Sequence, residues 1–144
     1  MELHQLAVVL LLALCAHAQP ADVMSRYKHF LNQHVFGNMN TGLCDSVIRT
    51  RKITAGITNN CKEINTFILA THEQVRAVCQ EGGIPKGRNL YESTKPFAVV
   101  ICRLRSGDRR PSCTYDGKRS TRTITVACDQ QWPVHYEEDR LFVY

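Results

Sequence analysis

The sequence lacks an apolar run long enough to cross a membrane, which takes roughly 20 apolar residues. Its longest apolar run lies between Leu6 and Cys15 and is followed by small residues up to Ala18. This order of a short apolar core and small residues is typical of a secretory signal peptide that is cleaved after the small residues. We therefore expect a signal peptide over residues 1–18 and a secreted mature chain over residues 19–144.

The sequence also lacks a CxxC pair, and no histidine stands at metal-ligand spacing from a cysteine, which argues against a structural zinc site. One of the seven cysteines, Cys15, lies in the expected signal. The other six form an even set, which in an oxidising compartment indicates three disulfides. Spacing alone does not choose among the roughly 15 ways of pairing six cysteines. They are Cys44, Cys61, Cys79, Cys102, Cys113 and Cys128.

No repeat, low-complexity tract or linker divides residues 19–144, so we expect a single domain and a monomer. The formal net charge is +5, and loss of the signal removes Glu2 and adds one positive unit. A small, secreted and basic protein favours polyanions as partners. RNA, heparin-like glycans and anionic membranes all fit this description, and charge does not separate them.

The order of helical and strand patterns predicts an α+β fold. Ser25 is placed to cap a first helix that runs to Val35, and Thr71 is placed to cap a helix within 70–79. A further helix is expected over 43–50. Strands are expected in NLYES, PFAVVICRL, SCTYD and TITVACD, with turns at SGDRRP and DGKRS.

Two histidines and a lysine are candidates for catalysis. His34 and His135 lie near opposite ends of the mature chain, and imidazole serves as a base or an acid near neutral pH. Lys62 carries a fixed charge that could stabilise a phosphoryl group in transition. Taken singly, each of these residues is more often an ordinary core or surface residue than a catalytic one.

Three segments resemble the pancreatic-type ribonucleases of the ribonuclease A superfamily. CKEINTF, residues 61–67, matches the CKxxNTF signature of that family. RYKHFLNQHV resembles the family's first helix with its catalytic histidine, and ITVACDQQWPVHY resembles its closing strand with the second histidine. The resemblance implies a ribonuclease A-like fold, with three helices packed on a bent antiparallel sheet and three disulfides.

The resemblance also implies a mechanism that needs no metal and no cofactor. His34 would act as general base, His135 as general acid and Lys62 as charge stabiliser, and RNA would be cut on the 3′ side of pyrimidines through a 2′,3′-cyclic phosphate. DNA would not be cut, because it lacks the 2′-hydroxyl. The resemblance further implies substrate-binding roles for Gln33, Asn65, Thr66, Tyr136 and Glu137.

The six cysteines resemble the angiogenin-like branch of the family. That pattern would pair Cys44 with Cys102, Cys61 with Cys113, and Cys79 with Cys128. The family's fourth disulfide would have closed a loop within residues 80–90, so we expect the site for the base after the cut to be weakened and turnover to be modest. The family's contacts to a more distant phosphate are matched here by His29 and Asn32. The sequence of the tail, EEDRLFVY, does not show whether it covers the pyrimidine pocket.

A basic segment, IRTRK, lies where angiogenin carries its nuclear-entry sequence. Arg49, Arg51 and Lys52 are therefore candidates for uptake to the nucleus or nucleolus, although a solvated basic loop explains them equally well. A second hypothesis is a cationic secreted effector, angiogenic or antimicrobial, that acts mainly by binding. Its partners would be a glycan, an anionic membrane or a cell-surface receptor, and the resemblance adds ribonuclease inhibitor as a partner.

Overall fold

The computed structural model describes residues 21–138, and both the expected signal peptide and the end of the tail lie outside this range. None of the helices in residues 21–138 is long and apolar enough to cross a membrane. The elements follow one another as α2 (Ala21–His34), η1 (Thr41–Leu43), α3 (Cys44–Thr50), β1 (Ile64–Ile68), α4 (His72–Arg76), η2 (Ala77–Cys79), β2 (Gly83–Pro85), β3 (Leu90–Ser93), β4 (Phe97–Ser106), β5 (Thr114–Arg122), β6 (Thr125–Asp129) and β7 (Trp132–Tyr136).

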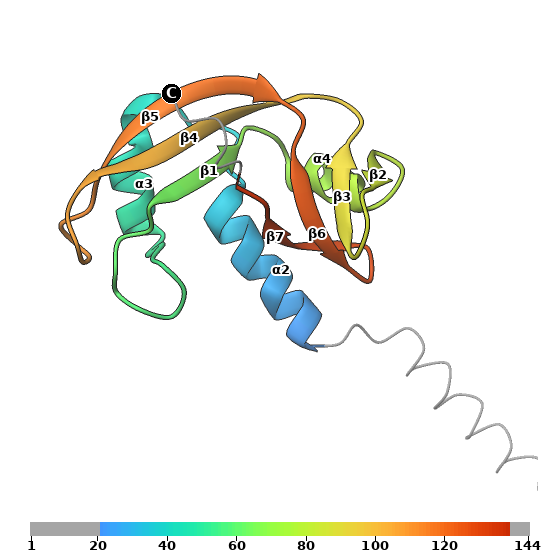
Figure 1. The fold of residues 1–144 in the computed structure, drawn as a ribbon, viewed down its shortest axis with the longest axis horizontal. Helices are drawn as coiled ribbons and strands as arrows, with labels where there is room; N and C mark the ends of the chain where they lie inside the picture. The colour runs from blue at the N-terminus through green and yellow to red at the C-terminus, as the bar shows by residue number, and fades with distance from the viewer. Residues whose placement is uncertain (1–20, 139–144) are drawn as a thin grey trace, which may run out of the picture.

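The strands form two antiparallel sheets, one with the order β1-β4-β5 and the other with the order β2-β3-β6-β7. The long strands β4 and β5 arch over the molecule, with α3 at one end and the second sheet at the other (Figure 1). Helix α2 lies beneath this arch and contacts both β1 and β7. The predicted α+β architecture, with three helices and three disulfides, is confirmed.

Strand β1 is shared by the two hydrophobic clusters of the core. Ile68 packs in one cluster with residues of α2, α4, β4 and β6, and Phe67 packs in the other with residues of α3, β4 and β5. Both side chains are fully buried. Because successive side chains of a strand point to opposite faces, one strand can hold both clusters together.

The three disulfides are Cys44–Cys102, Cys61–Cys113 and Cys79–Cys128. These are the pairs that the resemblance implied. The segment 80–90, where the family's fourth disulfide is absent, leads into a short hairpin. In this hairpin β2 pairs with β3, and Gly83 lies opposite Ser93. Backbone pairing therefore orders this loop where the family's fourth disulfide is missing.

Two boundary predictions are wrong. Ser25 does not cap the first helix but lies inside α2, because apolar positions continue a turn earlier to Val23, which is buried. The segment DGKRS is not a turn but the middle of β5. Its Gly117 is required because a Cβ there would lie 2.5 Å from the carbonyl oxygen of Thr41. The glycine thus marks a close approach of two backbones.

The closing segment forms two strands, β6 and β7, where the sequence suggested one. Gln130 and Gln131 form the turn between them, and both have positive φ, at 50° and 68°. Positive φ at both central residues is the geometry of the tight turn that matches the twist of a hairpin. The turn folds His135 back beside α2, where Tyr136 stacks on His34.

Arg51 joins the end of α3 to the end of α2. Its guanidinium donates hydrogen bonds of 2.9 Å to the carbonyl oxygens of Asn32 and Val35, and it lies over the ring of Phe36. In return, the side-chain amide of Asn32 donates to the carbonyl oxygen of Arg51, at 3.0 Å. The last carbonyls of a helix have no partner within it, so Arg51 satisfies groups that would otherwise need water.

We expect Arg51→Ala to lower the free energy of unfolding by about 1–3 kcal/mol, because it leaves helix-end carbonyls without their charged donor. Urea unfolding would measure this change. Arg49→Ala is the matched control, since Arg49 is an exposed arginine of the same segment and its loss should change stability by less than about 0.5 kcal/mol. Equal effects of the two substitutions would show that Arg51 does not secure the helix end.

Candidate functional site

His34 is the last residue of α2 and is almost completely buried, with 3% of its surface exposed. Its Nδ1 lies 2.8 Å from the carbonyl oxygen of Thr66 in β1. A carbonyl oxygen only accepts, so Nδ1 carries the proton and donates it, and Nε2 keeps an unprotonated lone pair. The ring stacks on Tyr136 at 5.2 Å and lies 5.5 Å from Phe30. The helix end thus presents a base of fixed tautomer and orientation.

Burial, and after it the positive charge of Lys62, lowers the pKa of His34 from 6.5 to about 3. The hydrogen bond to Thr66 acts in the opposite direction, and the charges of His135 and His29 make smaller contributions. His34 is therefore neutral at pH 7, which is the state a general base needs before it takes a proton.

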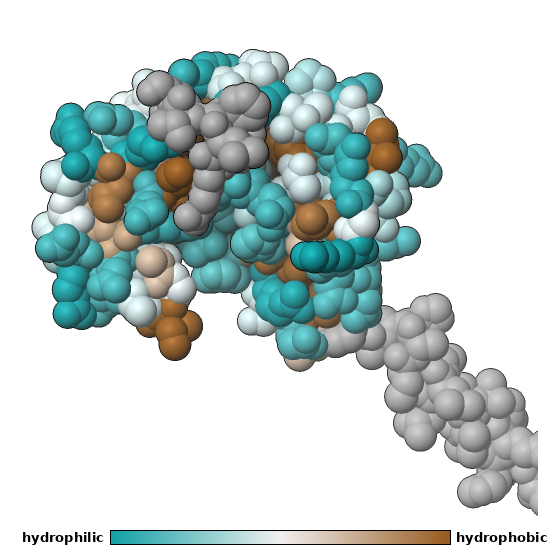
Figure 2. Space-filling view, in the orientation of Figure 1, coloured by the Kyte–Doolittle hydropathy of each residue, from teal (hydrophilic) through white to brown (hydrophobic). Residues whose placement is uncertain are grey.

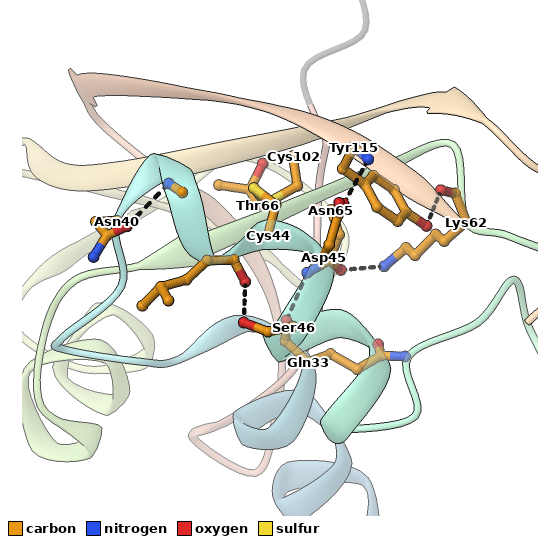
Figure 3. The surroundings of a disulfide bond; sticks show 12 residues. Gln33, Asn40, Cys44, Asp45, Ser46, Lys62, Asn65, Thr66, Cys102 and Tyr115 are labelled. Atoms are coloured by element: carbon orange, nitrogen blue, oxygen red, sulfur yellow. Dashed lines mark hydrogen bonds between the residues drawn. A yellow bond between two sulfur atoms is a disulfide. The ribbon is translucent and has the colours of Figure 1, made fainter. Parts of the chain in front are cut away.

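Lys62 is held in place by hydrogen bonds to its side chain and its backbone (Figure 3). Its Nζ donates to Oδ1 of Asn65 at 2.8 Å, and Asn65 in turn donates to the carbonyl oxygen of Gln33 at 2.9 Å. The hydroxyl of Tyr115 donates to the carbonyl oxygen of Lys62 at 2.7 Å. The buried Asn65 thus links the lysine to the residue that precedes His34.

Tyr115 is a supporting residue that the sequence analysis did not identify. Its backbone N–H donates to the carboxylate of Asp45 in α3 at 2.7 Å, while its hydroxyl reaches the segment before β1. Burial raises the pKa of Tyr115 above its usual value, so the hydroxyl remains protonated and able to donate. No local pattern indicates this role, because Tyr115 and Lys62 are far apart in the sequence.

His135 lies on β7 and is largely exposed. Its Nε2 is 3.1 Å from a carboxylate oxygen of Glu137, two residues further along the same strand end. With Nε2 facing this carboxylate, Nδ1 is the nitrogen left to meet a ligand. A carboxylate on one ring nitrogen fixes the orientation of the imidazole, because the partner of one nitrogen decides where the other points.

A cleft of about 510 Å³ brings the predicted catalytic residues together. His34 and Gln33 enter it from α2, Lys62 from the start of the β1 segment, and His135 from β7. The cleft therefore places a neutral base, a fixed ammonium group and an exposed imidazole around one volume. Such a set can abstract one proton, donate another and stabilise negative charge between them.

Glu138 is hydrogen-bonded to two groups of Thr66, a residue for which the resemblance implies a substrate-binding role. The backbone N–H of Thr66 donates to Glu138 Oε2 at 3.1 Å, and its hydroxyl donates to Oε1 at 2.5 Å. Glu138 was not among the residues predicted to form the site. Its sequence position beside Glu137 indicates no such contact, because the partner lies on a strand far away in the sequence.

The three basic residues of the IRTRK segment have different surroundings in the structure. Arg49 and Lys52 are exposed at the end of α3, whereas Arg51 is directed inward to α2. Of the two residues matched to the distant phosphate contact, His29 lines the cleft, and the side-chain amide of Asn32 donates to Arg51. Arg51 and Asn32 thus both have hydrogen-bond partners within the protein.

We expect the His34 ring to titrate in NMR experiments far below pH 6.5. Between pH 6.5 and about 3 the unfolded chain binds a proton at residue 34 that the folded chain does not, so stability falls as pH falls through this window. The slope from this residue should reach about 1.4 kcal/mol per pH unit. His34→Asn, which keeps a donor toward Thr66 but cannot titrate, should lose that slope. Parallel stability curves for the two proteins would contradict the assignment.

Comparison with known proteins gives consistent matches. Residues 25–137 match the family model described as pancreatic ribonuclease. The chain is 50% identical to Ribonuclease-like 3 of Danio rerio, over 96% of this chain and 97% of the relative. It is 41% identical to an angiogenin of Rhinopithecus avunculus, over 79% and 78% of the two chains.

The X-ray structure of zebrafish RNase5 superposes with a TM-score of 0.82 at 50% identity and covers 85% of this chain and all of its own. The fold is therefore ribonuclease A-like, and the catalytic candidates His34, Lys62 and His135 lie within the matched range. The chain belongs to the pancreatic ribonuclease family.

Proposed function

We propose that this protein is a secreted endoribonuclease that cleaves RNA on the 3′ side of pyrimidines without a metal ion. The observation that carries the proposal is the fixed tautomer of His34, whose proton is held at Nδ1 by the Thr66 carbonyl. This leaves a neutral Nε2 in the same cleft as Lys62 and His135. Family membership supports RNA as the substrate.

In the proposed reaction, Nε2 of His34 takes the proton of the ribose 2′-hydroxyl, and the oxygen attacks the adjacent phosphorus. The bond from phosphorus to the 5′-oxygen breaks as His135 protonates that oxygen. The products are a 2′,3′-cyclic phosphate end and a free 5′-hydroxyl. Lys62 stabilises the additional negative charge that the phosphoryl oxygens carry in the transition state.

We assign the selection of the pyrimidine base on the 5′ side of the cut to Thr66. Its N–H donates and its hydroxyl either donates or accepts, so the pair complements the carbonyl and ring nitrogen on a pyrimidine edge. Glu138 holds both groups in this structure. A substrate base must therefore displace two hydrogen bonds to a carboxylate, which supports the expectation of modest turnover.

The need to displace Glu138 before a base can bind also favours a second candidate function, that of a cationic effector that acts mainly by binding. Arg49, Lys52, Arg109 and Arg119 are exposed, and basic side chains of this kind contact polyanions through their charge. Uptake, receptor binding and antimicrobial action would then depend on the surface and not on the cleft. The two functions are compatible in one protein, and substitution of the histidines separates them.

We expect His34→Ala and His135→Ala each to lower the rate of RNA cleavage by about 10²–10⁴-fold, because each removes one proton-transfer group. Hydrolysis of a short pyrimidine-purine RNA would measure this, with the matched DNA and a chelator as controls. The wild type should ignore the chelator and leave the DNA intact. His72→Ala, an exposed histidine on α4, should keep full activity. Cleavage that survives both catalytic substitutions would contradict the proposed reaction.

The same His34→Ala, His135→Ala double variant discriminates between the two functions. If angiogenic or bactericidal action needs catalysis, the double variant should lose it together with RNA cleavage. Full retention of that action would identify binding as the main function. Circular dichroism of the variant is the necessary control for folding, because His34 is buried.

We expect Glu138→Ala to raise kcat/KM for RNA by about tenfold, which corresponds to about 1.4 kcal/mol. The substitution frees the N–H and hydroxyl of Thr66 for the substrate base. Glu138→Gln should lie between the wild type and the alanine variant, because an amide oxygen remains as a neutral acceptor. Unchanged or lower activity of Glu138→Ala would show that this contact does not compete with RNA.

A further inference from the structure

Residues 54–60, the loop between α3 and β1, form a wall of the catalytic cleft. Gly56 and Ile57 of this loop line the same cavity as the catalytic residues, and His29 lines it from α2. In Figure 1 the loop extends below β1, beside α2. Figure 2 shows a hollow between these two parts of the molecule, with hydrophobic surface at the tip of the loop.

This loop is tied down at its base. The N–H of Ala55 donates to the carbonyl oxygen of Asn60 at 3.0 Å, which closes the loop on itself. The backbone N–H of Arg110 donates to the carbonyl oxygen of Asn59, and that of Cys61 donates to the carbonyl oxygen of Asp108, both at 2.9 Å. The Cys61–Cys113 disulfide secures the same junction. The tip therefore projects from a base fixed to the β4–β5 turn.

Ile57 is fully exposed at this tip, with a relative exposure of 105%. It follows Gly56, whose φ of 61° makes the turn that presents it. The only other large hydrophobic residue exposed in residues 21–138 is Ile84, at 50%, on β2. Exposed apolar residues are common singly, but Ile57 stands in the wall of a catalytic cleft and Ile84 does not line that cleft.

We propose that Ile57 is a contact for a nucleobase of the RNA outside the cleaved dinucleotide. The inference rests on the proposed ribonuclease function. Bases of single-stranded RNA are unstacked and offer flat, largely apolar faces to protein side chains. The turn to which the loop is tied carries the exposed Arg109, which adds positive charge for the RNA backbone. A preordered loop lets Ile57 meet a base with little loss of conformational freedom.

An alternative partner is an anionic membrane, but the observations favour RNA. Membrane anchoring takes an extended apolar face or more than one inserted group, and this loop offers a single isoleucine among small and polar residues. Ile57 also lines the same cleft as His29 and Lys62, into which RNA must enter to be cut.

The test compares Ile57→Ser with Ile57→Leu and with Ile84→Ser, the matched control at the other exposed isoleucine. We expect Ile57→Ser to raise KM about three- to tenfold for an oligonucleotide of roughly 12 residues and to leave cleavage of a pyrimidine-purine dinucleotide unchanged. Ile57→Leu and Ile84→Ser should both behave as the wild type. Since the side chain of Ile57 is fully exposed, its substitutions should not change the unfolding midpoint.

Binding of a non-cleavable 2′-deoxy oligonucleotide, measured by fluorescence anisotropy, makes the outcome independent of catalysis. If the wild type cleaves no RNA, the proposed function fails, while weaker binding by Ile57→Ser would still support the contact. Wild-type oligonucleotide affinity and KM in Ile57→Ser would overturn the contact. The contact would also be overturned if Ile57→Ser bound RNA like the wild type but no longer bound vesicles that contain phosphatidylglycerol. That result would assign the loop to membrane binding.

Discussion

The hydrogen bond from Nδ1 of His34 to the carbonyl oxygen of Thr66 is the interaction on which the site depends. It joins the last residue of α2 to the central residue of β1, and it fixes the ring nitrogen that faces the cleft. A neutral imidazole has one donor and one acceptor nitrogen, and the partner of the first decides the position of the second. Burial of the ring against β1 keeps it neutral. The packing of α2 on β1 therefore sets both the orientation of His34 and its protonation state.

Thr66 links the chemistry of the cleft to the choice of base. Its carbonyl oxygen holds His34, while its N–H and hydroxyl are held by Glu138. A base that replaces Glu138 would therefore bind to the residue that also orients the general base. Pairing of Thr66 with Ile101 in β4 and the full burial of Phe67 keep this residue in register, since a slip by one residue would turn its side chain to the other face.

The basic residues show how the same residue type takes different roles through its surroundings. Lys62 is ordered by Asn65 within the cleft, and Arg51 is directed to the carbonyls that end α2. Arg49 and Lys52, which flank Arg51 closely in the sequence, are exposed. The sequence thus predicted a basic segment, but only the position of the end of α2 showed that Arg51 stabilises the fold while its neighbours stay exposed.

Much of the fold was predictable because its signals are local. Thr71 caps α4, as predicted, and the structure adds the reciprocal bonds of a capping box with Gln74. The strand patterns of β4 and β6 indicated their positions. The start of α2 and the middle of β5 were not predictable by the same means. Val23 extends the apolar face to a position two residues before Ser25, and Gly117 serves a close backbone approach that only the packed molecule contains.

Patterns in the sequence were enough to indicate the α+β class, the family, the disulfide partners through that family, and the candidates His34, Lys62 and His135. They were enough because helix caps, strand periodicity and the CKEINTF signature are properties of neighbouring residues. Tertiary structure alone decided that Glu138 meets Thr66, that Arg51 secures α2, and that Ile57 stands in the wall of the cleft. Each of these contacts joins segments whose separation in the chain carries no local signal, so only packing brings them together.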